Sequence, residues 1–249
     1  RSYGLLLVIV MLGASLAGTG ATGYYVLILS LVSTIPYSKK LPTSKLMMPL
    51  GFATNHPLLP INLALLFGVT ATVLETAGFH QEISMGRFAL VNLIMSAAFL
   101  AWSLIAYRFL PDHPIADASE DALAGTGFTA MVGDAVAGVL GSGVSPFVFI
   151  VAFALLTSTC ATFTGSNMGS VYIFAPIAIA ACTSLGLNPT AAAIAVVISG
   201  WNGGYMPIDG MPAMILGMGK YKLPEFWVFS VPMYLIRILA LCAGAVFIF

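Results

Sequence analysis

Long stretches of this sequence contain no charged residue, and this feature suits the chain to lipid rather than water. Residues 3–36, 46–74 and 135–208 contain no Lys, Arg, Asp or Glu. Only 7% of the 249 residues are charged and 59% are hydrophobic, whereas a soluble domain has about 25% charged residues. Helices satisfy their own backbone polar groups in lipid, so the pattern predicts an all-α integral membrane protein. The formal net charge of zero also excludes an electrostatic binder of nucleic acid.

Two apolar stretches each contain two arms around a short polar tip. In residues 3–36 the tip is 18–23, and in residues 145–184 it is 165–170. The first arm, residues 3–17, would be about 22 Å long as a helix, which is too short for a hydrocarbon core of about 30 Å. Each stretch therefore predicts a re-entrant hairpin, whose tip is buried in protein or faces a water-filled cavity.

An apolar segment with an interrupted middle follows each hairpin. The first broken helix covers 45–77 and is interrupted at 54–60, and the second covers 189–219 and is interrupted at 200–212. Repeats with paired broken helices are typical of secondary transporters. The sequence therefore predicts two inverted repeats, each with a re-entrant hairpin and a discontinuous transmembrane helix. The first repeat, 1–121, adds a closing helix at 86–110 and a polar linker at 111–121; the second, 122–249, adds a short helix at 128–142 and a closing helix at 224–249.

Lys and Arg concentrate in the cytoplasmic loops of membrane proteins, so their positions indicate topology. With the second repeat inverted relative to the first, six of them lie on the cytoplasmic side and Arg87 lies outside. The six are Lys39, Lys40, Lys45, Arg108, Lys220 and Lys222. We therefore expect a multi-pass protein of the cell (inner) membrane. The start at Arg1, with no charged segment before a short apolar core, predicts no signal peptide.

Several short motifs lie at the tips, at the breaks and at the start of the last helix. The second tip reads SNMGS at 166–170, and the first reads GTGAT at 18–22. The broken helices contain SKLMMPLGFA at 44–53 and MPIDGMPA at 206–213, and LPEFW at 223–227 begins the last helix. Over nearly the whole chain, these motifs resemble the divalent-anion/sodium symporters (DASS) of the ion transporter superfamily.

The chain differs from that family in ways that bear on its substrate. The first tip lacks the Ser and Asn of the family's Ser-Asn-Thr signature, and Met168 stands where the signature has Thr. Asp209 and Gly210 stand where the family has small neutral and hydroxyl residues. Family members also have scaffold helices before the first hairpin and between the halves. The chain therefore resembles a truncated or miniature member, or one with segments omitted near 121–122.

The resemblance implies sodium-coupled import of a dicarboxylate or related small anion by an elevator mechanism, in a homodimer. Free N–H groups at helix N-termini favour anions and free carbonyls at C-termini favour cations, so the tips and breaks suit such a site. Apart from sodium as the coupling ion, we expect no metal, no other cofactor and no enzyme activity. The expected substrate-binding residues are Ser166, Asn167, Met168, Thr19, Gly20, Asn55 and Gly210, and the expected ion-coupling residues are Asn167, Ser170, Thr22 and Asp209.

Two ionisable residues, Asp209 and Arg237, lie in apolar surroundings. Such groups are costly in a membrane and usually mark function, which for Asp209 would be cation or proton coupling. Alternatively, the two residues form a structural ion pair. Because a carboxylate repels a dianion, a proton-coupled transporter of a different anion is a second hypothesis. His56, in the first break, is a candidate to bind substrate or titrate, and Asp134 has no assigned role.

Two other classes of protein fit part of the sequence. A non-transporting structural or assembly subunit of a membrane complex would use the same small-residue helix interfaces. An intramembrane hydrolase would need paired catalytic groups, but Asp209 has no partner Asp and no Ser/His dyad is evident. Cys160, Cys182 and Cys242 lack the spacing of a disulfide framework or a zinc site. We therefore keep the transporter as the main hypothesis and the subunit as its alternative.

Overall fold

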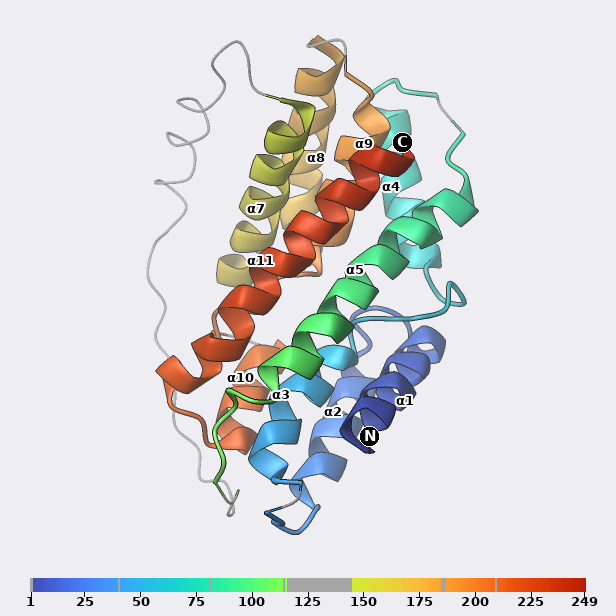
Figure 1. The fold of residues 1–249 in the computed structure, drawn as a ribbon. Coiled ribbons are helices and arrows are strands. Elements are labelled where there is room, and N and C mark those ends of the chain that lie inside the picture. Colours follow the sequence, from blue (N-terminus) through green and yellow to red (C-terminus); the bar gives the residue numbers. More distant parts are fainter. Residues whose placement is uncertain are drawn as a thin grey trace. The chain divides into compact units, whose positions relative to one another are not determined.

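The computed structural model describes most of the chain as helices and connecting loops. In the described ranges every regular element is an α-helix (Figure 1). Asp209, Asp134, the expected short helix at 128–142 and most of the polar linker lie outside the described residues. The described residues are 2–39, 41–80, 82–113, 115, 145–184, 187–208 and 210–249.

Two pairs of consecutive helices occupy the segments expected as hairpins. The first pair is α1 (Ser2–Ala17) and α2 (Thr22–Ser33), and the second is α7 (Pro146–Thr164) and α8 (Asn167–Ser184). Glycine turns the chain at both tips, because Gly18 and Gly165 directly follow the first helix of each pair and have φ of +90° and +66°. This left-handed backbone favours glycine, so local sequence ends both arms.

The segments expected as broken helices each form two shorter helices. The first consists of α3 (Thr43–Ala53) and α4 (Ala64–Thr76), and the second of α9 (Pro189–Gly200) and α10 (Gly210–Gly219). Prolines lie in both interruptions, where they limit helix continuation. The start of α9 is defined locally, because the Asn188 side chain accepts a hydrogen bond from the backbone N–H of Thr190 at 2.9 Å and Pro189 follows it.

Three of the described helices are long and apolar enough to cross a membrane. They are α7 and the two closing helices, α5 (Met85–Ala106) and α11 (Leu223–Ile248). A helix of about 20 apolar residues matches the thickness of a hydrocarbon core. The described part of the chain therefore fits an all-α membrane protein.

The helices divide between two compact units that interleave along the chain. Unit 1 contains α1, α2, α3 and α10, with α5 from Met95 onward and α11 up to Arg237. Unit 2 contains α4, α7, α8 and α9, with α5 up to Ile94 and α11 from Ile238 onward. Each unit thus combines one hairpin and the broken-helix segment that follows it with the second segment of the other broken helix.

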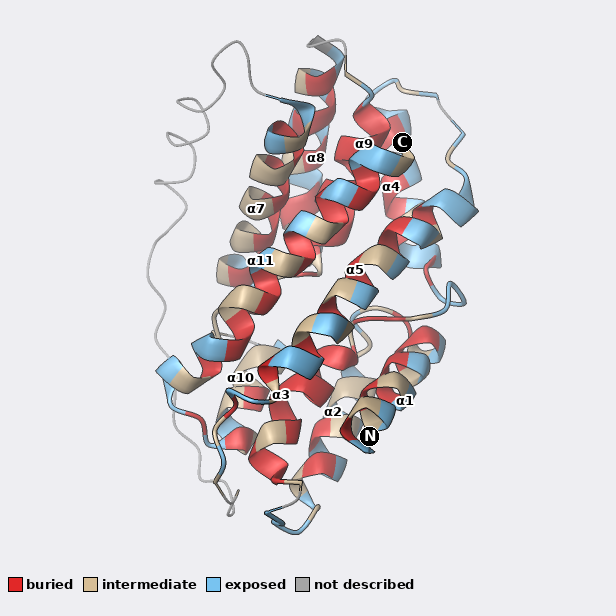
Figure 2. Cartoon of the chain, in the orientation of Figure 1, coloured by how far each residue is buried: buried red, intermediate tan, exposed pale blue. Residues whose placement is uncertain are grey.

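The same packing pairs occur inside both units. In unit 1, α3 packs against α1, α2 and α10, and α2 also packs against α10. In unit 2, α9 packs against α7, α8 and α4, and α8 also packs against α4. The central helices are almost completely buried, α9 at every position and α3 at every position except Lys45 (Figure 2). Small residues in α9 allow its neighbours to approach closely.

Candidate functional site

In unit 1 the first hairpin tip contacts the first break. The backbone N–H of Gly20 donates a hydrogen bond to Oδ1 of Asn55 at 2.8 Å. Near it, Nδ2 of Asn62 donates to the carbonyl of Leu16, near the end of α1, at 3.2 Å. The structure therefore brings together Gly20 and Asn55, two residues that the sequence indicated separately as substrate ligands.

Ser15 holds the first break against the hairpin from inside α1. Its Oγ accepts hydrogen bonds from the backbone N–H groups of Leu58 and Leu59 at 3.0 and 2.9 Å, and donates to the carbonyl of Met11 at 3.0 Å. Sequence reasoning missed Ser15, because a single Ser in an apolar helix looks like a small packing residue. Its contacts show that it fixes the backbone beyond Asn55 rather than facing a ligand.

The first tip also contains a buried polar atom. Oγ1 of Thr19 is buried and has no hydrogen-bond partner among the described residues. Leaving such a hydroxyl unsatisfied costs about 1–3 kcal/mol, which a ligand could recover. Thr22, exposed, begins α2, where Ala21 provides no side-chain cap, so the first N–H groups of α2 stay available for an anion.

Helix ends of opposite polarity meet in unit 1. Beyond the C-terminus of α3, Oγ1 of Thr54 donates to the carbonyl of Gly51 at 2.6 Å and lies 3.4 Å from Sδ of Met211, in the first turn of α10. Gly210, exposed and with a φ of +54°, is the first residue of α10. The C-terminal end of α3 and the N-terminal end of α10 are thus neighbours, and the last carbonyls of α3 accept hydrogen bonds from the N–H groups of Thr54, Asn55 and His56.

In unit 2 the side chains of the second tip form local contacts. The exposed Ser166 accepts a hydrogen bond on Oγ from the N–H of Gly169 at 3.1 Å, and its carbonyl accepts one from Oγ of Ser170 at 2.9 Å. Asn167, half-buried, is the first residue of α8, and Met168 beside it is exposed. Ser166 therefore caps α8, and its side chain is less free to bind a ligand than the sequence suggested.

The second break packs tightly against the second hairpin. A Cβ at Gly200 would lie 2.5 Å from Cγ2 of Val171 and 3.3 Å from the carbonyl oxygen of Asn167. Asn202 follows, buried, with its Nδ2 donating to the carbonyl of Ile198 at 2.7 Å. Sequence reasoning missed Asn202, yet it is the second residue after α9, as Asn55 is the second residue after α3. An Asn at the same position of both breaks was the available signal.

Two basic side chains, His56 and Arg237, are buried in unit 1. The ring of His56 is fully buried, stacks on Phe99 at 4.0 Å between centroids, and donates from Nδ1 to the carbonyl of Phe52 at 2.7 Å. Arg237 is 1% exposed, and its Nη1 lies 3.9 Å from Sδ of Met233. Because Asp209 is outside the described residues, an Asp209–Arg237 pair stays a prediction.

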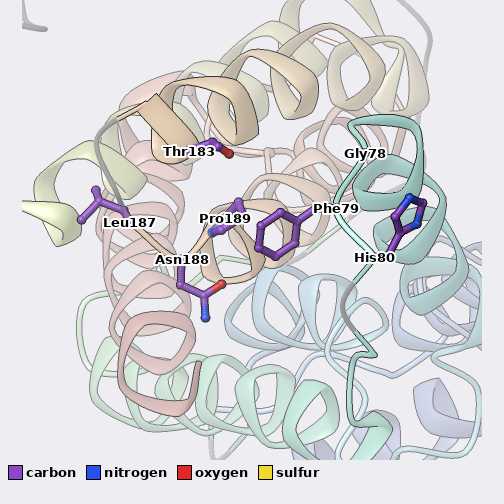
Figure 3. Close-up of a pocket in the computed structure, with 7 residues that line it drawn as sticks. All are labelled: Gly78, Phe79, His80, Thr183, Leu187, Asn188 and Pro189. Atoms are coloured by element: carbon purple, nitrogen blue, oxygen red, sulfur yellow. The ribbon is translucent and has the colours of Figure 1, made fainter.

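An open surface pocket in unit 2 contains none of the predicted site residues. Its volume is about 660 Å³, and the ring of Phe79 lies beside Pro189 and Asn188 (Figure 3). The oxygen of the Asn188 side chain caps α9, and its Nδ2 donates to the carbonyl of Phe249 at 3.0 Å. Both polar groups of the Asn188 side chain therefore have partners within the protein. The tips and breaks are the better candidates for ligand binding.

Compared with models of known protein families, with curated proteins and with solved structures, the chain matches none. The chemistry of the tips and breaks is therefore the main indication of function. Each unit contains one candidate site made of a tip and a break. In unit 1 it consists of residues 18–22 and 54–56, and in unit 2 of residues 165–170 and 200–203.

Proposed function

We propose that the protein is a secondary active transporter that imports a dicarboxylate or related small anion together with sodium, by an elevator mechanism. The observation that carries the proposal is the hydrogen bond from Gly20 to Asn55, which joins a glycine-rich tip to a helix break. Broken helices of transporters provide free backbone groups for substrate and ion in this way. The resemblance to DASS supports the same function, in a homodimer and in the cell (inner) membrane with several crossings.

The matched packing of the two units supports inverted repeats. Each repeat contributes its hairpin and the first part of its broken helix to one unit and the second part to the other, as expected for two repeats related by a two-fold axis. The 16 residues of α1 and 12 of α2 would extend about 24 and 18 Å, which favours a re-entrant first hairpin. Because α7 is long enough to cross a membrane, the second hairpin is assigned by analogy with the first.

The chemistry of unit 1 matches an anion accompanied by a cation. The uncapped start of α2 and the start of α10 present N–H groups to an anion, and Arg237 adds a buried positive charge. The negative end of the α3 dipole suits a cation such as sodium, as does the hydroxyl of Thr19, which has no hydrogen-bond partner among the described residues. In unit 2, Asn167 and Ser170 would take the corresponding role.

Uptake by vesicles reconstituted with the protein tests this proposal. We expect labelled succinate, citrate or sulfate to accumulate above the level in empty vesicles when sodium is directed inward, and to stop accumulating when the sodium gradient is removed. Uptake driven by a proton gradient instead would favour proton coupling. Absence of flux for every substrate and gradient, with folded protein, would support the structural subunit and reject the transporter.

Replacing Asn55 tests the site in unit 1. Asn55→Ala removes the acceptor of the Gly20 N–H, so we expect uptake to fall roughly three- to tenfold, the value of one hydrogen bond. The matched control is Asn62→Ala, in the same stretch but bonded to a carbonyl of α1 instead of the tip, which should retain more activity. Initial uptake rates per folded protein provide the measurement. Equal rates for Asn55→Ala and the parent would remove the tip contact from the site.

A further inference from the structure

A buried serine in the first turn of α3, Ser44, joins two loops to that helix in unit 1. Oγ of Ser44 donates to the carbonyl of Pro111 at 2.9 Å and accepts from the N–H of His113 at 3.0 Å. The carbonyl of Ser44 accepts a hydrogen bond from the hydroxyl of Tyr221. The first turn of α3, the segment after α5 and the loop from α10 to α11 are therefore joined at one place.

Further contacts support the same arrangement. The hydroxyl of Tyr37 donates to Asp112 at 2.9 Å, which links the loop before α3 to the segment after α5. This hydrogen bond to a carboxylate raises the pKa of Tyr37, so its phenol stays protonated as the donor. The ammonium group of Lys45 lies 5.5 Å from the centre of the Tyr107 ring. Side chains before and within α3 thus contact the segment that follows α5.

Around these contacts, the basic residues that the structure describes outnumber the acidic ones that it describes. Asp112 accepts the hydrogen bond from Tyr37, and Glu225 accepts one from the backbone N–H of Lys222 at 2.7 Å at the start of α11. The basic side chains are exposed except for Lys45, which is half-buried. We call this group of residues the basic end, and it consists of Lys39, Lys45, Arg108, Lys220 and Lys222.

Exposed aromatic residues lie in the same segments. Tyr37 precedes Lys39, Phe109 follows Arg108 and is 63% exposed, and Trp227 lies in the first turns of α11. Aromatic side chains collect where a membrane meets water, and Lys and Arg collect on its cytoplasmic side. This combination of residues is the one expected at the level of the lipid headgroups of a cytoplasmic leaflet.

We propose that the basic end binds the headgroups of anionic phospholipids such as phosphatidylglycerol. Clusters of Lys and Arg beside membrane helices attract anionic lipid, and each contributes about 1 kcal/mol at the surface. A soluble polyanion would find the same charges but could not use the adjacent aromatic side chains. The proposal depends on membrane insertion and is independent of transport.

Native mass spectrometry of the purified protein in detergent tests this, with equal amounts of phosphatidylglycerol and phosphatidylcholine added. We expect phosphatidylglycerol to be bound in excess. The combined variant Lys39→Gln, Arg108→Gln and Lys222→Gln should reduce that excess by roughly tenfold or more, from the contribution of each basic residue. Lys220 is kept because its positive φ makes substitution harder to interpret.

Arg87→Gln is the matched control, because Arg87 lies in unit 2, over the ring of Phe249. It should retain the preference for phosphatidylglycerol, and thermal unfolding should show that both variants fold. Equal binding of the two lipids by the parent, or an unchanged preference in the combined variant, would overturn the proposal. So would stabilisation by heparin without a lipid preference, which would identify a soluble polyanion as the partner.

Discussion

Gly200→Leu is expected to destabilise unit 2 strongly. The first atom of the new side chain would lie 2.5 Å from Val171 and 3.3 Å from the backbone of Asn167. Because α9 is buried at every position, the leucine has no exposed direction to take. Overpacking of this kind costs about 1–3 kcal/mol, and more where backbone is in the way. Thermal unfolding in detergent should show a clear loss of stability, together with loss of uptake.

Gly68→Leu provides the control for helix propensity and hydrophobicity. Gly68 is an exposed residue of α4, and nothing lies within 4 Å of its Cβ position. The same substitution there should raise stability by about 0.5–1 kcal/mol, because Leu favours a helix interior more than Gly does. If Gly200→Leu unfolds at the temperature of the parent, α9 does not pack against the second hairpin as described.

Arg237→Met is expected to separate stability from transport. A charged Arg at the centre of a membrane helix costs about 3 kcal/mol, and methionine has a similar length without the charge. We therefore expect the unfolding temperature to stay the same or rise. Uptake should fall roughly ten- to a hundredfold, the value of a hydrogen bond to a charged group, because the proposed anion site loses its buried positive charge.

A purely structural role of Arg237 predicts the opposite result for Arg237→Met: a loss of stability without a loss of uptake. If Arg237 only forms a structural ion pair, its removal leaves an uncompensated buried charge and costs about 3–5 kcal/mol. Uptake per folded protein would then be unchanged. Arg237→Lys, which keeps the charge but loses the planar donor group, should retain part of the activity only under the transport hypothesis.

Local features of the sequence mark some of the helix ends. Gly18 and Gly165 mark the ends of α1 and α7, and Pro189 marks the start of α9. The sequence did not predict that α10 belongs to the unit of α3 and α4 to the unit of α9. This arrangement depends on packing between segments more than 100 residues apart. Only the folded chain shows that α3 is covered by α10 and α9 by α4.

The candidate site was also predictable only where the sequence carries a local signal. Gly20 and Asn55 stood out as a tip glycine and a break amide, and the structure joins them. Ser15 and Asn202 did not stand out, because one lies in an apolar run and the other among glycines. Their importance comes from the partners that folding brings to them. The functional role of all four residues stays a prediction that the uptake measurements decide.

The interleaving of the units has a consequence for biogenesis. A ribosome makes α1, α2 and α3 well before α10, which packs against two of them and follows them far along the chain. Unit 2 has the reverse order, since α4 is made early and waits for α8 and α9. Neither unit is complete until helices that lie far apart in the sequence have both been made, so the earlier helices of each unit stay without these partners until then.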